Sequence, residues 1–497
     1  MCNFVAEFIY EFKPKNYFKM KKLFLTIMAT AMYSAVFAGG MFTNTNQNVY
    51  FLRNPGRGAS STEIDAVYSN PAGLAFMQHE GFTLSLNNQS AWQTRTATTT
   101  FAPFAMNGGD ATKEFKGEVS ALFIPSVMAA YKWKNFVFSG AFAIVGGGGT
   151  IEFKNGLPMF EAQVAGSLFQ PLTQLNGAAT QAGYAGAPLG YSLNMNLEGT
   201  SITYGTQLGV TYKINELFSG FVGARASFVG NGYEGYLRDV MITNAEAVKT
   251  HFTDTADYLE SLGQTAQAET IREAAAGVTN LQAGAAQTDI AIDLTQSGWG
   301  IAPILGLNFN YEKLNVGVKY DFNTNITLKN KTKVNTSGMP AFDDKVKSDY
   351  DIPALLTVGA SYKFFNDKLT ASAGYHLFFD KQADMTDAKQ KHLANNSHEL
   401  LAGLEYQICD RVLVSAGGQL TRIGLTDEFQ SDLSFTSNSY SIGFGTQIKI
   451  TEKLSANLAY FFTNYDDYTK DAPFGTASKT VYSRSNQTFG IGLDYKF

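Results

Sequence analysis

The sequence predicts an all-β fold: an antiparallel transmembrane β-barrel of about fourteen strands, with an N-terminal segment that plugs its lumen as a hatch. Three observations support this prediction. Charged residues make up 16% of the 497 residues, against roughly 25% in soluble globular proteins, whereas Gly (47), Phe (39) and Tyr (25) are abundant. The chain ends in a strictly alternating segment, and six short polar turns each join two similar segments.

The C-terminal segment, residues 487–497, defines the two faces of a strand. Its period of two directs the small and polar residues toward a polar lumen and the large apolar ones toward lipid. The lipid-facing residues are Phe489, Ile491, Leu493, Tyr495 and Phe497. We expect Leu493, Tyr495 and Phe497 also to form the signal that the barrel assembly machinery recognises.

The N-terminal residues carry a predicted export signal. Residues 20–38 combine a basic start, a short apolar run and a cleavage signal, Val36-Phe37-Ala38. The alternative is a membrane anchor, which the length of the apolar run disfavours, because a spanning helix needs about 20 residues. Residues 1–19 would then be a non-native upstream extension, and the mature chain would begin near Gly39.

The strand count follows from the short turns. Six turns join twelve strands, and the run at residues 82–86 and the C-terminal strand raise the total to about fourteen, an even number as in bacterial barrels. The turns lie at residues 131–135, 213–216, 311–313, 364–368, 408–411 and 450–453.

The other connections are longer, as expected for extracellular loops. Two of them carry helical spacing, strongly at residues 244–282 and weakly at 160–175, and helices there would cap the extracellular mouth. The long connections lie near residues 93–117, 147–196, 238–287, 330–349, 381–396, 423–432 and 466–480.

Residues 39–80 precede the predicted barrel, residues 81–497, and have turn chemistry with little alternation. A barrel of this size would otherwise enclose a water-filled opening, so we predict that this segment is the hatch. The alternative is a disordered periplasmic tail. It is disfavoured because Tyr50, Leu52 and Val67 are more apolar than a solvated tail requires.

This segment ends in Asn70-Pro71-Ala72-Gly73-Leu74, where the chain resembles the FadL/TodX family of outer-membrane transporters for long-chain fatty acids and other hydrophobic compounds. That family has a fourteen-stranded barrel and a hatch marked by Asn-Pro-Ala. The resemblance covers essentially the whole mature chain, including the runs Ile124-Pro125 and Gly298-Trp299-Gly300 and the terminal Phe. It implies passive uptake across the outer membrane of a Gram-negative cell.

The motif alone is weak evidence for a hatch, because Asn-Pro favours turns in any protein. Its position directly before the first strand favours the hatch. Asn70 can bond local backbone, Pro71 fixes φ, and Ala72 with Gly73 permits close packing against the wall.

The resemblance also implies a lumenal arginine that meets the ligand carboxylate, and Ala224-Arg225-Ala226 is similar to the family's run in strand five. The period agrees, because Val222, Ala224, Ala226 and Phe228 share the lipid face. An unpaired Arg225 would attract a carboxylate. The alternative is a structural ion pair with an acid such as Asp321, and it stays equally open. Lys319 and His376 also face inward and would assist, or would be solvated lumen residues.

Two further sites are implied by the family alone. The family opens its wall at a kink in strand three, and here the glycines Gly146, Gly147 and Gly148 would weaken pairing, or merely lead flexibly into a loop. The family also has an extracellular apolar groove. Its candidate lining residues here, chosen from composition, are Leu157, Met159, Phe160, Leu168 and Phe169.

Other functions find less support. The net charge of −5 argues against nucleic acid, no metal-ligand or catalytic spacing is legible, and we expect no cofactor. The two cysteines, Cys2 and Cys409, cannot form a disulfide framework. We expect a monomer in contact with outer-membrane lipid that takes up long-chain fatty acids or similar hydrophobic molecules. The alternatives are a lipid-modifying enzyme that uses His376, and an adhesin or structural barrel that uses its long loops.

Overall fold

A computed structural model describes residues 48–475 and 477–497. The predictions made for residues 1–47 lie outside the described residues: the upstream extension, the signal peptide at 20–38 and the first part of the hatch.

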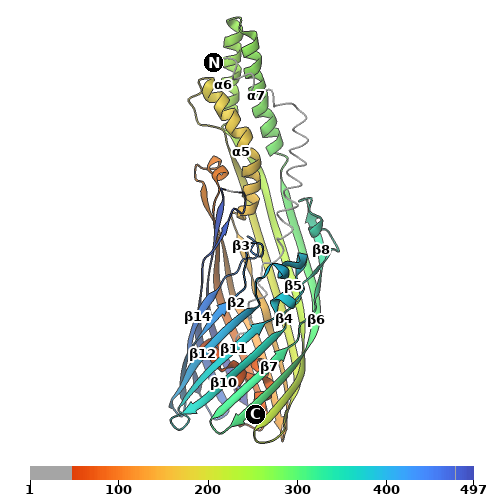
Figure 1. The fold of residues 1–497 in the computed structure, drawn as a ribbon, viewed down its shortest axis with the longest axis vertical. Coiled ribbons are helices and arrows are strands. Elements are labelled where there is room, and N and C mark those ends of the chain that lie inside the picture. Colours follow the sequence, from red (N-terminus) through yellow and green to blue (C-terminus); the bar gives the residue numbers. More distant parts are fainter. Residues whose placement is uncertain (1–47, 476) are drawn as a thin grey trace.

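The described residues form one closed antiparallel sheet, in which fourteen strands make up the wall of a barrel, as predicted (Figure 1). β1 pairs with β2 on one side and with the C-terminal β17 on the other, which closes the barrel. The wall strands are β1 (Gly81–Thr100), β2 (Thr112–Trp133), β3 (Phe136–Phe153), β4 (Gly190–Lys213), β5 (Phe218–Thr243), β6 (Ile290–Tyr311), β7 (Leu314–Asp321), β10 (Leu355–Phe364), β11 (Leu369–Phe378), β12 (Ser397–Cys409), β13 (Val412–Arg422), β14 (Ser439–Lys449), β15 (Leu454–Tyr465) and β17 (Lys479–Lys496).

All six predicted short turns are confirmed, and they lie together at one end of the barrel with the C-terminus (Figure 1). Three short strands extend the sheet among the long connections. They are β8 (Thr327–Asn335) beside β6, β9 (Lys347–Asp349) beside β8, and β16 (Tyr468–Asp471) beside β17. Short 3-10 helices occur in the same connections: η3 (Ala102–Met106), η4 (Pro340–Phe342), η5 (Asp380–Gln382) and η6 (Thr386–His392).

The strands next to the first long connection are longer than predicted. The connection expected at residues 93–117 shrinks to 101–111, because Thr94–Thr100 stays paired with both β2 and β17. Outside the membrane neither face of a strand must be apolar, so the alternation that marks a membrane strand fades while the pairing continues.

The two faces of the wall follow the predicted period. In β17 the residues from Phe489 to Phe497 at odd positions are exposed on the outside, whereas Thr488 and Asp494 are buried inside. Trp92 and Trp299 are also exposed on the outer face, and Trp299 stacks with Phe228. Large aromatic side chains at such positions are typical of a membrane-facing surface.

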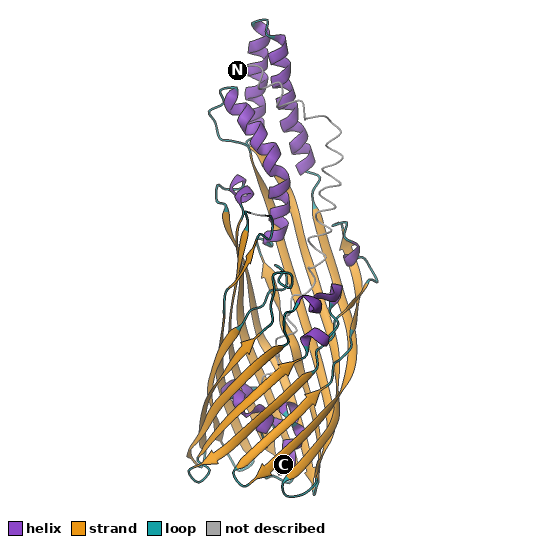
Figure 2. Cartoon of the chain, in the orientation of Figure 1, coloured by secondary structure: helices purple, strands orange, loops and turns teal. Residues whose placement is uncertain are grey.

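Both helical predictions for the loops are confirmed. α5 (Pro158–Gln181) lies between β3 and β4, and α6 (Ala245–Ser261) and α7 (Thr265–Ala285) lie between β5 and β6. The three helices stand beyond the end of the barrel opposite the short turns (Figure 2). They share one apolar cluster that includes Leu172, Phe252 and Val278. Within the described residues, no helix is long and apolar enough to cross a membrane.

Residues 48–80 enter the lumen before β1 begins. They form four short helices, α3 (Val49–Arg53), η1 (Pro55–Ser60), α4 (Ala66–Ser69) and η2 (Pro71–Phe76), which lie inside the barrel near its short-turn end (Figure 2). Val49, Leu52 and Val67 of these helices are fully buried, in one apolar cluster with residues of the wall such as Met128 and Phe461. A solvated tail therefore does not describe residues 48–80, and we call this segment the hatch from here on.

Candidate functional site

The Asn-Pro-Ala motif joins the hatch to the wall. Asn70 is fully buried, and its side-chain amide donates hydrogen bonds to the carbonyl of Ala59 in the hatch (3.0 Å) and to the carbonyl of Leu307 in β6 (3.2 Å). Pro71 begins η2, where its missing N–H costs no hydrogen bond. Ala72 packs against Phe221 and Ile304 of the wall. Gly73 instead approaches Ser61 of the hatch, where a Cβ would lie 2.1 Å from the carbonyl oxygen.

Side chains of the wall satisfy the carbonyls that the short hatch helices leave free. Gln207, Thr211 and Ser219 donate to the carbonyls of Val67, Pro71 and Ala72, at 2.7, 2.7 and 2.6 Å. Asn315 donates to the carbonyl of Ser60 and Lys319 to that of Tyr68, at 2.8 and 3.0 Å. The hatch is therefore held by many single hydrogen bonds, each of which contributes about 1 kcal/mol net.

The wall has glycines, which lack side chains, where the hatch contacts it. A Cβ on Gly317 would lie 1.8 Å from the carbonyl oxygen of Ala59 and 2.5 Å from the Asn70 amide, and a Cβ on Gly306 would lie 2.7 Å from Asn70. No side chain fits at these two inward positions while the hatch is in place.

A buried charge network fixes the first half of the hatch. Arg53 and Arg57 both bind one oxygen of Glu405 on β12, at 2.5 and 2.8 Å, and Arg57 also binds Asp65 at 3.1 Å. The Tyr50 ring lies about 5 Å from both guanidinium carbons, and its hydroxyl donates to Asp494 on β17 at 2.5 Å. This network was not predicted from the sequence, because an arginine within an irregular segment shows no period that would indicate burial.

Arg225 points into the lumen as its period predicts, but it is not the unpaired cation of one of the two hypotheses. It binds Asp321 at 3.0 Å and Gln207 at 2.7 Å, and its guanidinium carbon lies 4.7 Å from the centre of the Tyr68 ring. Lys319 binds the other oxygen of Asp321 at 2.8 Å. The ion-pair alternative therefore describes this structure, with two cations sharing one carboxylate beside the hatch.

His376 also points inward but has its own partner. Its Nδ1 lies 2.8 Å from Glu399 on β12, and Gln419 donates to the same carboxylate. His376 occupies the position on β11 that lies two strands from Lys319, with Thr357 of β10 between them. Among residues 48–475 and 477–497, no group of three or more His, Cys, Asp and Glu side chains is placed to hold a metal ion.

A cavity of about 70 Å³ lies between the hatch and the wall at this charged group. Its lining joins Tyr68 of the hatch and the ion pair of Arg225 and Asp321 to apolar residues of the wall. The apolar residues include Val145, Ala302, Ile304, Phe322, Ile352 and Phe378. This space holds a few water molecules or a small polar group, and it has no room for a long alkyl chain while the hatch is in place.

The wall has a gap in its hydrogen bonding between β2 and β3. The two strands pair from the turn up to Ser126 and Ala143, and pairing resumes at Val119 and Ile151, so residues 120–125 and 144–150 have no ladder partners on each other. Gly146, Gly147 and Gly148 lie in this gap, and Gly147 and Gly148 have φ of +69° and +123°, which favour glycine. On its other edge β3 stays paired with β4 through two irregularities at these glycines.

Two outward-facing polar residues of β1 hold β2 at the gap. Asn88 accepts a hydrogen bond from the N–H of Ile124 at 3.1 Å, and both Asn88 and Ser90 donate to the carbonyl of Leu122, at 3.2 and 2.8 Å. Leu122 and Phe123 are consecutive and both exposed, so the alternation of β2 slips here. This slip was not predicted, although polar residues at lipid-facing positions between Leu86 and Trp92 were a sequence signal for it.

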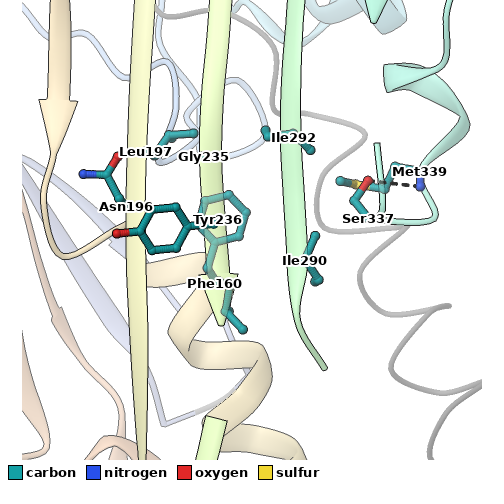
Figure 3. Close-up of a pocket in the computed structure, with 10 residues that line it drawn as sticks. Phe160, Asn196, Leu197, Gly235, Tyr236, Ile290, Ile292, Ser337 and Met339 are labelled. Carbon is teal, nitrogen blue, oxygen red and sulfur yellow. Dashed lines mark hydrogen bonds between the residues drawn. The ribbon is translucent and has the colours of Figure 1, made fainter. Parts of the chain in front are cut away.

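An apolar pocket lies farther toward the helices, between β4, β5 and β6 (Figure 3). Phe160 of α5 and Met339 of the connection after β8 contribute to it, together with Leu197, Tyr236 and Ile292 of the strands.

Of the five groove residues predicted from composition, only Phe160 lines this pocket. Leu157 and Met159 do not line this pocket, because both are buried in the apolar cluster that contains Leu197 and Met339. Leu168 is buried in the cluster shared by the three loop helices, and the half-buried Phe169 does not line the pocket either. The extracellular groove itself stays a prediction. Composition indicates that a helix is apolar but not which of its faces stays open.

Comparisons with known proteins agree with this architecture. A family model described as an outer membrane protein beta-barrel domain matches residues 259–497, and no curated protein matches the chain. A FadL homologue from Pseudomonas aeruginosa superimposes with a TM-score of 0.58 at 12% identity, over 93% of this chain and 100% of that chain. The toluene transporter TodX of Pseudomonas putida gives 0.51 at 14% identity, over 88% and 95%. A deletion mutant of TodX, described as a monoaromatic hydrocarbon channel, gives 0.52 at 13% identity, over 90% and 99%.

The molecule is thus an outer-membrane β-barrel protein. Its fold is that of the FadL and TodX channels, a fourteen-stranded barrel with an N-terminal segment in the lumen.

Proposed function

We propose that this protein is a passive channel for long-chain fatty acids or similar hydrophobic molecules across the outer membrane. The observation that carries the proposal is the charged group beside the hatch. Arg225 and Lys319 supply two positive charges against the single carboxylate of Asp321. The cavity that Arg225 and Asp321 line combines the polar side chains of Ser227 and Thr324 with apolar side chains of the wall. A carboxylate with an alkyl chain matches both properties, because the excess cation attracts the head group and apolar burial retains the chain.

The path begins at the outer apolar pocket of Figure 3. Each methylene that leaves water there contributes about 0.8 kcal/mol, so affinity is expected to rise with chain length. The pocket has a volume of only about 30 Å³ and almost no polar lining besides Asn196 and Ser337, which suits capture of the end of a chain rather than of a head group.

Passage past the charged group requires the hatch to move, because the cavity is too small for a long chain. The wall-to-hatch hydrogen bonds at Asn70, Gln207, Thr211 and Ser219 would break one by one, and no single bond costs more than about 1.5 kcal/mol. These bonds support displacement of the second half of the hatch, whereas the buried ion pairs of Arg53 and Arg57 with Glu405 hold its first half in place.

The gap between β2 and β3 offers an exit through the wall into the membrane. The strand backbones there make no ladder bonds to each other, so separating β2 from β3 at this place breaks none of the barrel's pairing. We propose lateral release at Gly146–Gly148, which suits a product that partitions into lipid.

Binding to the purified protein tests the proposal. We expect the affinity for saturated fatty acids of increasing length to rise, and Arg225→Ala to weaken binding of the acids about tenfold while leaving their methyl esters unaffected. Arg422→Ala, an exposed arginine at the end of β13, is the matched control. An affinity that does not change with chain length would refute the apolar path. An equal loss of affinity for acids and esters in Arg225→Ala would indicate a neutral hydrophobic substrate.

A further inference from the structure

Two buried arginines of the outer lumen face each other without an acid. Arg95 of β1 and Arg484 of β17 are direct cross-strand partners, and they are 7% and 8% exposed on the lumenal side of the wall. Directly opposed residues have Cβ atoms about 5 Å apart, and like charges at that spacing destabilise a sheet.

The other buried arginines of the lumen behave differently. Arg53, Arg57 and Arg225 each lie within about 3 Å of a carboxylate. Across the part of the chain that the structure describes, neither Arg95 nor Arg484 takes part in an ion pair, and the Nε of Arg484 is buried without a hydrogen-bond partner. The Nε of Arg95 donates to Gln93 at 2.7 Å.

The acids on neighbouring elements are engaged elsewhere. Asp432 accepts from the Tyr482 hydroxyl at 2.5 Å and from the N–H of Met159 at 2.8 Å. Burial also raises the pKa of Asp432 above its ordinary value. Asp427 is bound by Tyr468 and Asp467 by Ser483, both at the exposed surface.

Aromatic rings flank the two guanidinium groups. The Arg95 group lies over the Phe435 ring at 5.8 Å and the Arg484 group over the Tyr465 ring at 4.4 Å, while Phe435 stacks on Tyr482 at 4.7 Å. Rings on the faces leave the N–H edges of the guanidinium groups for a planar anion. Of these rings, Phe435 and Tyr482 are buried, whereas Tyr465 is half-buried.

The loop that carries Phe435 also contacts two buried or half-buried lysines. Lys389 donates to the hydroxyl of Ser434 at 3.2 Å, and Lys470 donates to the carbonyl of Gln430 at 2.9 Å. Residues 430–435 therefore contact three cations, Arg95, Lys389 and Lys470, and the only carboxylate of this stretch, Asp432, is already bound.

We propose that Arg95 and Arg484 form a second binding site, which takes the carboxylate of an amphiphilic molecule while the half-buried ring of Tyr465 contacts its apolar part. The site is separate from Arg225, which lies on β5 and binds Asp321. In transport, this site would bind carboxylated molecules between the outer mouth and the hatch. This role rests on the proposed function. Binding of a carboxylate at Arg95 and Arg484 does not depend on the proposed function.

Equilibrium dialysis of radiolabelled decanoate tests this site, with the full-length protein in a non-ionic detergent and protein-free micelles as the blank. The background is Arg225→Ala, so that only the outer site binds the head group. We expect Arg95→Gln or Arg484→Gln to lower the affinity for decanoate at least tenfold and to leave decanol unchanged. Arg95→Lys keeps the charge but loses the planar set of N–H donors. Its affinity for decanoate should lie between that of the Arg225→Ala background and that of Arg95→Gln.

Arg422→Gln is the control, because Arg422 is exposed and carries no ion pair in the described residues. Unchanged decanoate affinity in Arg95→Gln/Arg484→Gln would overturn the proposal. So would displacement of decanoate by inorganic phosphate at equal concentration, since the site would then take a free anion rather than an amphiphile.

The thermal stability of the barrel tests the site independently of uptake. Removing one of two opposed charges should raise the temperature at which the empty barrel unfolds, because repulsion across β1 and β17 disappears. A lower unfolding temperature in Arg484→Gln would show a structural role and contradict the site. Failure of uptake in the intact protein, with decanoate binding retained, would refute the transport function and leave the site standing.

Discussion

Asn70 of the hatch donates a hydrogen bond to the backbone carbonyl of Leu307 in β6, across 237 positions of sequence, and so ties the plug to the wall. The same amide also binds Ala59, so one side chain both folds the hatch and docks it.

Asn70→Ala should loosen the hatch without unfolding the barrel. Two hydrogen bonds are lost, and the carbonyls of Ala59 and Leu307 each lose a donor, which costs about 2 kcal/mol. Amide hydrogen exchange of residues 48–77 should therefore speed up about thirtyfold, while the strands stay protected. Asn155→Ala, at an exposed position outside the hatch, is the control, and equal exchange in both variants would contradict this role of Asn70.

Gly317→Ala should keep the hatch from seating. The added Cβ would lie 1.8 Å from the backbone oxygen of Ala59, and a backbone atom cannot move aside as a flexible side chain can. We expect the variant to fold and to leak small antibiotics into cells, measured as a lowered inhibitory concentration. Gly230→Ala has open space around its Cβ and should not leak. An unchanged inhibitory concentration in Gly317→Ala would mean that the hatch is not what closes the lumen to small molecules.

A disulfide across the wall gap should block release. A Cβ on Gly149 would lie 3.3 Å from the Cβ of Ala121, close to the usual separation in a disulfide of roughly 3.8 Å. In a Cys409→Ser background, Ala121→Cys/Gly149→Cys should lose uptake when oxidised and recover it on reduction. Ser126→Cys/Ala143→Cys joins the same strands where they are already paired, and its uptake should not change. Normal uptake through the oxidised first pair would exclude the lateral exit.

The extracellular connection between β11 and β12 should open as pH rises. Burial raises the pKa of Asp380 to about 7, above its ordinary value near 3.8, and its carboxyl accepts a hydrogen bond from the N–H of Ser397 at 3.0 Å. The folded connection thus favours the protonated form. Its extra stability is complete below about pH 4 and is lost progressively as the pH rises to about 7, at about 1.4 kcal/mol for each pH unit.

Limited proteolysis of residues 379–397 between pH 5 and 8 measures this opening. Cleavage should quicken with pH in the wild type and stay nearly constant in Asp380→Asn, which is neutral throughout. The same pH dependence in both proteins would show that another group titrates.

The wall was predictable from the sequence because it obeys a strict local rule. Membrane strands alternate, short turns interrupt them, and from this the inward direction of Arg225 and Lys319 followed directly. The rule weakens where the strands leave lipid, so β1 extends past its predicted end to Thr100.

The hatch contacts were not predictable in the same way. Arg53 and Glu405 are 352 positions apart, and Tyr50 and Asp494 are 444 apart, so no local pattern connects them. Asp321 could be named from the sequence as one partner of Arg225, but whether the pair forms depends on the register of β5, β6 and β7. The slip at Leu122 in β2 likewise depends on side chains of the neighbouring strand.

Uptake of labelled palmitate tests the central claim most directly. The host is a Gram-negative strain that lacks its own fatty-acid transporter, and insertion of the protein is verified in each culture. We expect uptake well above the empty-vector level, with a further loss in Arg225→Ala for palmitate but not for a neutral hydrocarbon. An inserted, folded barrel that leaves palmitate uptake at the empty-vector level would contradict the proposed function.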